Sequence, residues 1–258
     1  MTSTVLLALE TSTEYCSVAL LCSEASSDAP QSAQSAQSVL TQVWTRHEPT
    51  GAVSSTRVLP AVRELFDEAG LTLAACSAIA FGAGPGSFTG LRTATGVAQG
   101  LAFGLNVPVV PISTLLVCAE SARRRDPSIS RVLVALDARM DEVYWADYAW
   151  DGGEWRTVAP PSLGVPEALV APDGPFALAG NAAAVFGPRL AAAERAVVID
   201  RDALPHAQPL ALAALRAYRA GHTVRAEHAA PEYVRDKVAQ TTAERLAQRE
   251  AHGGQEAR

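Results

Sequence analysis

The sequence predicts an α/β protein built from two related lobes, because one short pattern occurs twice. The stretch TVLLALETSTEYCSVALL reads as two strands joined by a turn, and its first strand ends in an acidic residue, Glu10. The stretch RVLVALDARMDEVYWADY repeats this pattern, with residues 5–10 aligning with residues 132–137 and Glu14 aligning with Asp141. We interpret the pair as one β-hairpin unit that is used twice.

Two lobes that each open with such a hairpin resemble the architecture of actin, sugar kinases and Hsp70 ATPases. We therefore expect the actin-like ATPase fold (ASKHA, RNase H-like), and a chain of 258 residues is long enough for two cores. We expect the first lobe at 1–108, completed by a helix at 206–222. The second, reduced lobe is expected at 109–205 together with 223–240, and 241–258 is expected to be a frayed or disordered tail.

The elements between and after the hairpins follow from local signals. A polar, low-complexity loop, QSAQSAQS, covers residues 31–38, and helical periodicity then covers 56–69. The stretch CSAIAFGAGPGS predicts a buried strand entering a Gly/Pro turn, after which Ser87 or Thr89 begins a helix. NVPVVPIST predicts another strand that enters another helix, whereas the elements of 151–179 are hard to place.

Composition limits the classes of function. Hydrophobic residues make up 48% of the chain and charged ones 19%, which is typical of a globular protein. With a net charge of −6 and Lys237 as the single lysine, the chain lacks a broad basic field, so contact with RNA requires partners. The four cysteines have no CxxC spacing and are expected to be reduced thiols. The N-terminal stretch MTSTVLLALETST has the features of neither a signal peptide nor a membrane span, so we expect a cytoplasmic protein without membrane contact.

The stretch FGAGPGSFTGLRTATGVAQG, residues 81–100, is rich in glycine. It is not a P-loop, because Lys237 lies far away, and not a dinucleotide fingerprint, because Ser87 stands where the third glycine belongs. Ser87 also lacks the flanking glycines of a nucleophile elbow. The free N–H groups of the GAGPGS turn are able to bind an anion, although without specificity.

Small residues recur every four positions along the helix that follows this turn. Glycine costs about 1 kcal/mol relative to alanine inside a helix, so a close contact must compensate for several of them. A ridge of this kind either packs tightly inside one lobe or forms a protein–protein face. The first row comprises Gly86, Gly90, Ala94, Ala98 and Ala102, and the second comprises Gly96, Gly100 and Gly104.

Candidate catalytic groups are few. The five histidines include no pair at the three- or four-residue spacing of a helical metal site, so we expect no metal. Glu10 and Asp137 end the first strands of the two hairpins. They are candidates to flank one cleft, which would be a vestigial nucleotide site. The intervening turn, ETSTE, has no glycine to admit a phosphate, so we expect no ATP hydrolysis and no cofactor.

Four segments of the chain resemble the TsaB (YeaZ) family of tRNA threonylcarbamoyladenosine synthesis. They are LALETSTEYCSVAL, AFGAGPGSFTGLRTATGVAQGLAFGLNVPVVPISTL, LVALDARMDEVYWADY and EHAAPEYVRDKVA. Within them, GPGSFTGLR and DARMDEVYWA are highly specific. The 31–38 loop and the tail after Ala239 have no family counterpart that we can place.

The resemblance implies a two-lobed actin-like subunit that does not itself transfer the threonylcarbamoyl group. The family is a paralogue of the catalytic subunit TsaD, which binds metal through a His-x3-His just after a matching VP…P strand. Thr114 and Cys118 stand at those two positions here. The resemblance therefore implies no catalytic residue and no metal site in this chain.

The resemblance also implies partners. The chain would activate a TsaD-like transferase acting on adenosine 37 of tRNAs that read ANN codons, a TsaE-like ATPase would join the complex, and tRNA would be contacted only through it. The helices at 56–69 and 86–103 would pair with the TsaD-like subunit, or with a second copy when it is absent. The implied interface residues are Val58, Leu59, Val62, Leu65, Phe66, Gly86, Gly90, Ala94, Val97, Ala98 and Leu101.

Two alternatives remain. The chain could be an independent actin-fold enzyme, either a kinase or a glycoprotease-like protein, but the missing metal ligands and phosphate loops argue against both. It could also be a homodimeric structural protein, which only a partner pull-down separates from an activating subunit.

Overall fold

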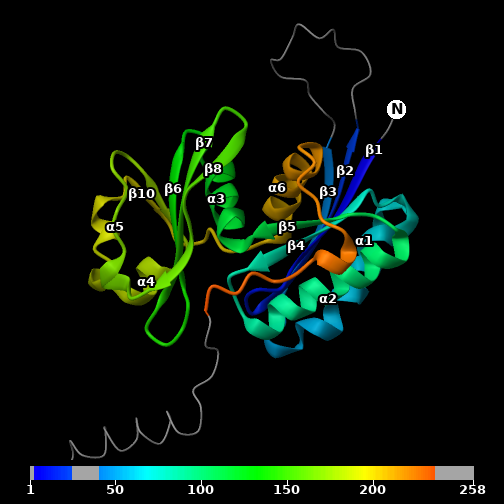
Figure 1. Ribbon diagram of the computed structural model, residues 1–258, viewed down its shortest axis with the longest axis horizontal. Helices are drawn as coiled ribbons and strands as arrows, with labels where there is room; N and C mark the ends of the chain where they lie inside the picture. The colour runs from blue at the N-terminus through cyan, green and yellow to red at the C-terminus, as the bar shows by residue number, and fades with distance from the viewer. Residues whose placement is uncertain (1–2, 25–40, 236–258) are drawn as a thin grey trace, which may run out of the picture.

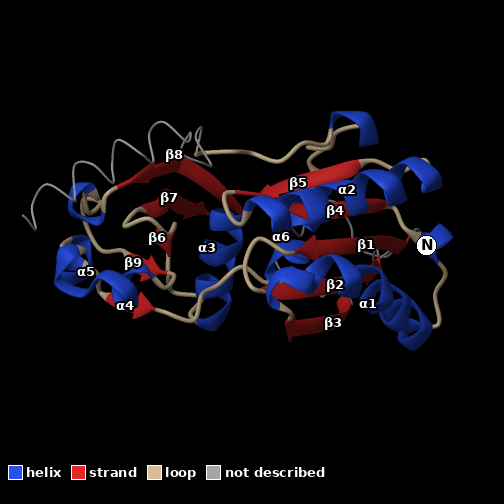
Figure 2. Cartoon of the chain, turned by 90° about the horizontal axis from the view of Figure 1, so that it is seen from below, coloured by secondary structure: helices blue, strands red, loops and turns tan. Residues whose placement is uncertain are grey.

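The computed structural model describes residues 3–24 and 41–235. They form two mixed β-sheets of five strands each, flanked by helices, and Figure 2 shows the sheets in separate halves of the molecule. The predicted 31–38 loop and 241–258 tail lie outside the described residues. No helix among the described residues is long and apolar enough to cross a membrane.

The first sheet has the order β3-β2-β1-β4-β5. Its central strands are almost continuously apolar, as expected where helices cover both faces of a sheet. β1 pairs antiparallel with β2 and parallel with β4, so the predicted N-terminal hairpin is confirmed. The strand bounds are β1 Ser3–Glu10, β2 Tyr15–Glu24, β3 Thr41–Pro49, β4 Ala78–Gly84 and β5 Val109–Ser113.

The second sheet repeats the first. Read as β8-β7-β6-β9-β10, it has the same succession of two antiparallel and two parallel pairings, so the repeat predicted for one hairpin extends to all five strands. Its last two strands, β9 and β10, have only three residues each. The bounds are β6 Arg131–Asp137, β7 Val143–Asp151, β8 Glu154–Gly164, β9 Ala177–Ala179 and β10 Val198–Asp200.

Two predicted helices cover one face of the first sheet. α1 covers Ser54–Ala69, and Gly70 caps its end with a φ of +66°, a conformation that favours glycine. α2 covers Phe88–Leu105, and Ser87 caps its start, since the Ser87 hydroxyl accepts the Gly90 N–H at 3.4 Å. Alternate residues of β1 pack against these helices. The opposite face is covered by α6 (Ala207–Arg219), which lies in the predicted 206–222 range (Figure 1).

At the junction of the lobes, each sheet is covered by a helix that follows the other sheet in the sequence. α3 (Thr114–Arg125) follows the first sheet but packs on the second, whereas α6 follows the second sheet and packs on the first. The two helices touch, and Arg216 of α6 pairs with Glu120 of α3. The short helices α4 (Ala182–Phe186) and α5 (Ala192–Arg195) contribute to a further core on the second sheet.

Two expected boundaries differ from the structure. We expected the second lobe to begin at 109, but β5 pairs with β4 and belongs to the first sheet. We also expected 223–240 to join the second lobe; residues 236–240 lie outside the described residues. In the described part, Val224 forms a bridge with Val109, and the one-turn helix Ala226–His228 packs on α2. Val224, Ala226 and Ala229 of this segment pack in the core of the first lobe. Sequence periodicity does not reveal which core a segment joins.

Candidate functional site

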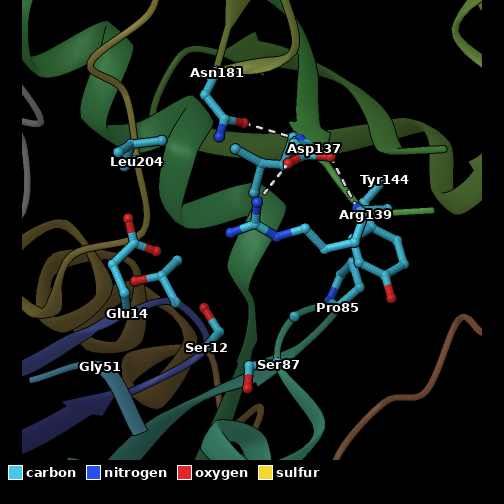
Figure 3. A pocket seen from close by; sticks show the side chains of 14 residues that line it. Ser12, Glu14, Gly51, Pro85, Ser87, Asp137, Arg139, Tyr144, Asn181 and Leu204 are labelled. Atoms are coloured by element: carbon cyan, nitrogen blue, oxygen red, sulfur yellow. Dashed lines mark hydrogen bonds and ion pairs between the residues drawn. The ribbon is translucent and has the colours of Figure 1, made fainter. Parts of the chain in front are cut away.

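A cleft of about 420 Å³ lies between the two lobes. The β1–β2 turn (12–14) and the turn before α2 (85–87) line it from the first lobe. Residues 136–139, Tyr144 and Asn181 line it from the second. Figure 3 shows the two sets facing each other, with Ser12, Glu14 and Ser87 opposite Asp137 and Arg139. The repeated hairpin explains this arrangement. The β1–β2 turn and the β6–β7 turn connect equivalent strand pairs, and both lie at the junction of the lobes.

Asp137 lines the cleft, and its carboxylate is engaged by Arg139. Its Oδ1 accepts the Arg139 N–H at 2.9 Å, and its Oδ2 lies 3.2 Å from the Arg139 guanidinium. Its own N–H donates to Asn181 Oδ1 at 2.9 Å. The side chain is 11% exposed, whereas that of Arg139 reaches into solvent. The second-lobe wall therefore presents an arginine together with an acid that this arginine neutralises.

Glu10 does not face Asp137 across the cleft, which corrects our expectation. It is 1% exposed and lies behind the first-lobe wall, outside the set of described residues that line the cleft. Its Oε1 accepts the Ser12 N–H at 2.6 Å, and its Oε2 has no hydrogen-bond partner in the described part of the chain. Burial raises the pKa of Glu10 to about 7, and the hydrogen bond from the Ser12 N–H opposes the rise.

Thr114 and Cys118, which occupy the two positions highlighted by the resemblance, lie close to Glu10 at the start of α3. The Thr114 hydroxyl donates to the carbonyl of Pro85. Burial raises the pKa of the Cys118 thiol well above its ordinary value, and the neighbouring Glu10 adds to the rise. Within 3–24 and 41–235, no group of three or more His, Cys, Asp or Glu residues is arranged to hold a metal ion.

The first small-residue row of α2 packs inside the lobe, which corrects the expectation that it faces a partner. Ala94, Ala98 and Ala102 are buried in the core of the first lobe. At Gly90, a β-carbon would overlap the carbonyl oxygen of Thr11, and the Thr11 hydroxyl donates to the Gly90 carbonyl at 2.7 Å. This row is small because the β1–β2 turn approaches the helix backbone.

The remaining predicted interface residues divide by exposure. Val58, Val62, Leu65 and Phe66 are buried in the same core and cannot contact a partner in this structure. Leu59 is 51% exposed, whereas Gly86, Val97 and Leu101 are half-buried.

The second glycine row lies on the outer side of α2. For Gly96, Gly100 and Gly104, a β-carbon would have no described atom within 4 Å other than those of its own helix. Next to this row, Phe103 is 78% exposed. We did not predict Phe103; its spacing of three and seven residues from Gly100 and Gly96 was the available signal, since these positions share one side of a helix. We call Gly96, Gly100, Phe103 and Gly104 the outer strip of α2.

Comparisons with known proteins show the family of this chain. A model of the TsaD family, described as tRNA N6-adenosine threonylcarbamoyltransferase, matches residues 48–243. The tRNA threonylcarbamoyladenosine biosynthesis protein TsaB of Escherichia coli (strain K12) is 36% identical over 241 residues, which cover 91% of this chain and 96% of that protein. TsaB of Haemophilus influenzae is 34% identical over 249 residues, with coverages of 92% and 96%.

Solved structures give the same result. The structure of YeaZ from Pseudomonas aeruginosa has a TM-score of 0.73 and 39% identity, covering 89% of this chain and 99% of its own. A second structure from that organism, an uncharacterised protein similar to peptidase YEAZ, has a TM-score of 0.77 and 40% identity, covering 90% of this chain and 100% of its own. Fold and cleft thus define a two-lobed α/β protein with the actin-like fold. The chain belongs to the TsaD family and, within it, to the TsaB proteins.

Proposed function

We propose that this chain is a non-catalytic partner that activates a TsaD-like transferase in the formation of N6-threonylcarbamoyladenosine at position 37 of tRNAs reading ANN codons. Its close relatives are named for this biosynthesis. The main support for the absence of catalysis is the chemistry of Thr114 and Cys118. By the resemblance, TsaD has its metal-binding histidines at these two positions. A hydroxyl bound to a backbone carbonyl and a buried thiol with a raised pKa do not fit a metal site.

The cleft also fits a metal–triphosphate poorly. Of the two expected acids, Glu10 lies behind the wall, and the Asp137 carboxylate is occupied by Arg139. The first-lobe turn that lines the cleft, 12–14, consists of Ser, Thr and Glu, whose side chains and negative charge disfavour a close phosphate. We therefore assign no cofactor and no ATP hydrolysis to the isolated chain.

We assign the contact with the TsaD-like subunit to the outer strip of α2 together with Leu59 of α1. Three glycines on an exposed helix side are unfavourable by about 1 kcal/mol each, so a close helix–helix contact is expected to compensate. Phe103 supplies an exposed aromatic side chain, and aromatic side chains contribute strongly to interface energies. A second copy would cover this strip when the TsaD-like subunit is absent, a TsaE-like ATPase would join the complex in the cytoplasm, and tRNA would bind only through it.

Reconstitution tests this function. Purified TsaD-like and TsaE-like subunits, with threonylcarbamoyl-AMP as the activated donor, should modify tRNA only when this chain is added. Phe103→Asp should abolish co-purification and modification, whereas Val170→Asp, which alters a residue 79% exposed on the second lobe, should leave both intact. Full modification without this chain, or with Phe103→Asp, would contradict the proposal.

A further inference from the structure

The segment after α6 returns across the first lobe and reaches the second, as the orange part of the ribbon in Figure 1 shows. Val224 exchanges two backbone hydrogen bonds with Val109, each 2.8 Å long. Further along, the Gln99 side chain of α2 donates to the carbonyl of Ala229 at 2.7 Å. The segment is therefore fixed to the first lobe before it approaches the cleft.

Its next residues are attached at the start of α2. The Glu232 N–H donates to the carbonyl of Ala83 at 2.6 Å. The ring of Tyr233 lies 5.4 Å from that of Phe88, and its hydroxyl accepts a hydrogen bond from Arg92 Nε at 3.1 Å. Backbone and aromatic contacts thus hold this end against the first-lobe wall of the cleft.

Arg235 then crosses to the second lobe. Its guanidinium lies 2.6 Å from the carboxylate of Glu142 and donates to the carbonyl of Ala138 at 3.0 Å. The Arg235 side chain is largely buried, so solvent screens this ion pair less than it screens an exposed pair such as Arg63–Asp67 of α1. Both of its partners belong to the turn between β6 and β7, and Ala138 lines the cleft.

The turn that Arg235 holds has an unfavourable backbone. Arg139, Met140 and Asp141 have φ angles of +62°, +55° and +63°, a left-handed conformation that non-glycine residues seldom adopt in succession. Arg189 of the second lobe forms two hydrogen bonds with the Asp141 carboxylate. The turn is thus held from its own lobe by Arg189 and from the first lobe by Arg235.

We propose that residues 229–235 are a latch that holds the two lobes together beside the cleft, and that the Arg235–Glu142 contact is its releasable end. Residues 85–86 and 138 line both the cleft and the small cavity of about 190 Å³ under the latch, so a change at the latch acts directly on both walls. Release of Arg235 detaches the strained turn from the first lobe, while Arg189 still holds it in the second, and lets the lobes separate about the α3–α6 junction.

Hydrogen–deuterium exchange of the full chain tests the latch. Arg235→Ala should speed exchange in both cleft walls, at 12–15 and 138–142, by roughly tenfold, the effect of losing hydrogen bonds to a charged group. Exchange in the cores of β1 and β6 should not change. The matched control is Arg225→Ala, which removes an exposed ion pair with Glu227 from the same segment without touching the second lobe.

Faster exchange confined to 138–142 would overturn the proposal, because Arg235 would then only brace its turn. Equal effects of the Arg225 and Arg235 variants would overturn it as well. If Arg235→Ala does not fold, Glu142→Gln decides, since it removes the ion pair and keeps the side-chain shape. Faster exchange of both walls in Glu142→Gln supports the latch, and unchanged exchange rejects it.

Discussion

The carboxylate of Glu10 lies directly over Gly82, and its Oε2 occupies the space into which a β-carbon at residue 82 would project. The contact joins the end of β1 to the neighbouring strand β4. The contact explains Gly82 by the packing of a side chain inside the lobe, and not by a phosphate or a partner helix.

Gly82→Ala should therefore destabilise the protein by about 1–3 kcal/mol, the usual cost of overpacking a well-packed interior. The new methyl group meets Glu10 and also comes within 3.1 Å of the Thr114 methyl group. Urea unfolding measures the change. Gly96→Ala is the control, because its methyl group meets no described atom and should raise the free energy of unfolding by up to about 1 kcal/mol. A neutral Gly82→Ala would show that Glu10 moves aside freely.

Glu10→Gln should stabilise the protein at alkaline pH. The pKa of Glu10 is about 7 when folded and 4.5 ordinarily, so the folded state binds more protons between these values. The stability that the neutral carboxyl contributes is complete below pH 4.5 and is lost as the pH rises through 7. The free energy of unfolding of the variant, relative to wild type, should increase by about 2–3 kcal/mol from pH 5 to pH 8. A difference independent of pH would contradict the assignment.

His206 should give the opposite pH dependence. Burial lowers its pKa to about 4, with contributions from His47 and Arg125, and its Nδ1 accepts the N–H of Gln208 at 3.1 Å to cap α6. The unfolded chain binds more protons between pH 4 and 6.5, so stability falls as the pH drops through this range. With screening at this partly exposed site, the loss should be on the order of 1–2 kcal/mol.

The variant His206→Asn tests this, because asparagine also caps helices but does not titrate. Urea unfolding between pH 4.5 and 7 should show a weaker pH dependence for the variant than for wild type. An identical dependence would assign the effect to other groups.

The two sides of α2 should respond differently to the same substitution. Ala98→Leu adds volume to the buried row and should cost about 1–3 kcal/mol of stability. Gly100→Leu adds it to the outer strip, where it should leave the fold intact and weaken binding to the TsaD-like subunit roughly tenfold or more. Calorimetric binding and urea unfolding of both variants separate the effects. Loss of binding by a stably folded Ala98→Leu, with Gly100→Leu unaffected, would reverse the assignment.

The sequence by itself determined the features that depend on neighbours along the chain. The two hairpins follow from strand patterning and the repeat, and the two helices follow from periodicity, which acts within a few residues. The helices predicted at 56–69 and 86–103 are observed at 54–69 and 88–105, so the ends shift by up to two residues. Family membership was also predictable, because the GPGSFTGLR and DARMDEVYWA segments carry it without reference to the fold.

Only the tertiary structure decided which of these features face solvent, the core or each other. Both rows of α2 are equally small, and which one is buried depends on how the helix rolls against β4 and the β1–β2 turn. Glu10 and Asp137 end equivalent strands, yet in the folded protein Glu10 is buried behind the cleft wall and Asp137 lies on it. The contact of Arg235 with Glu142 joins residues 93 positions apart, and no local signal encodes a pairing set by how the two lobes dock.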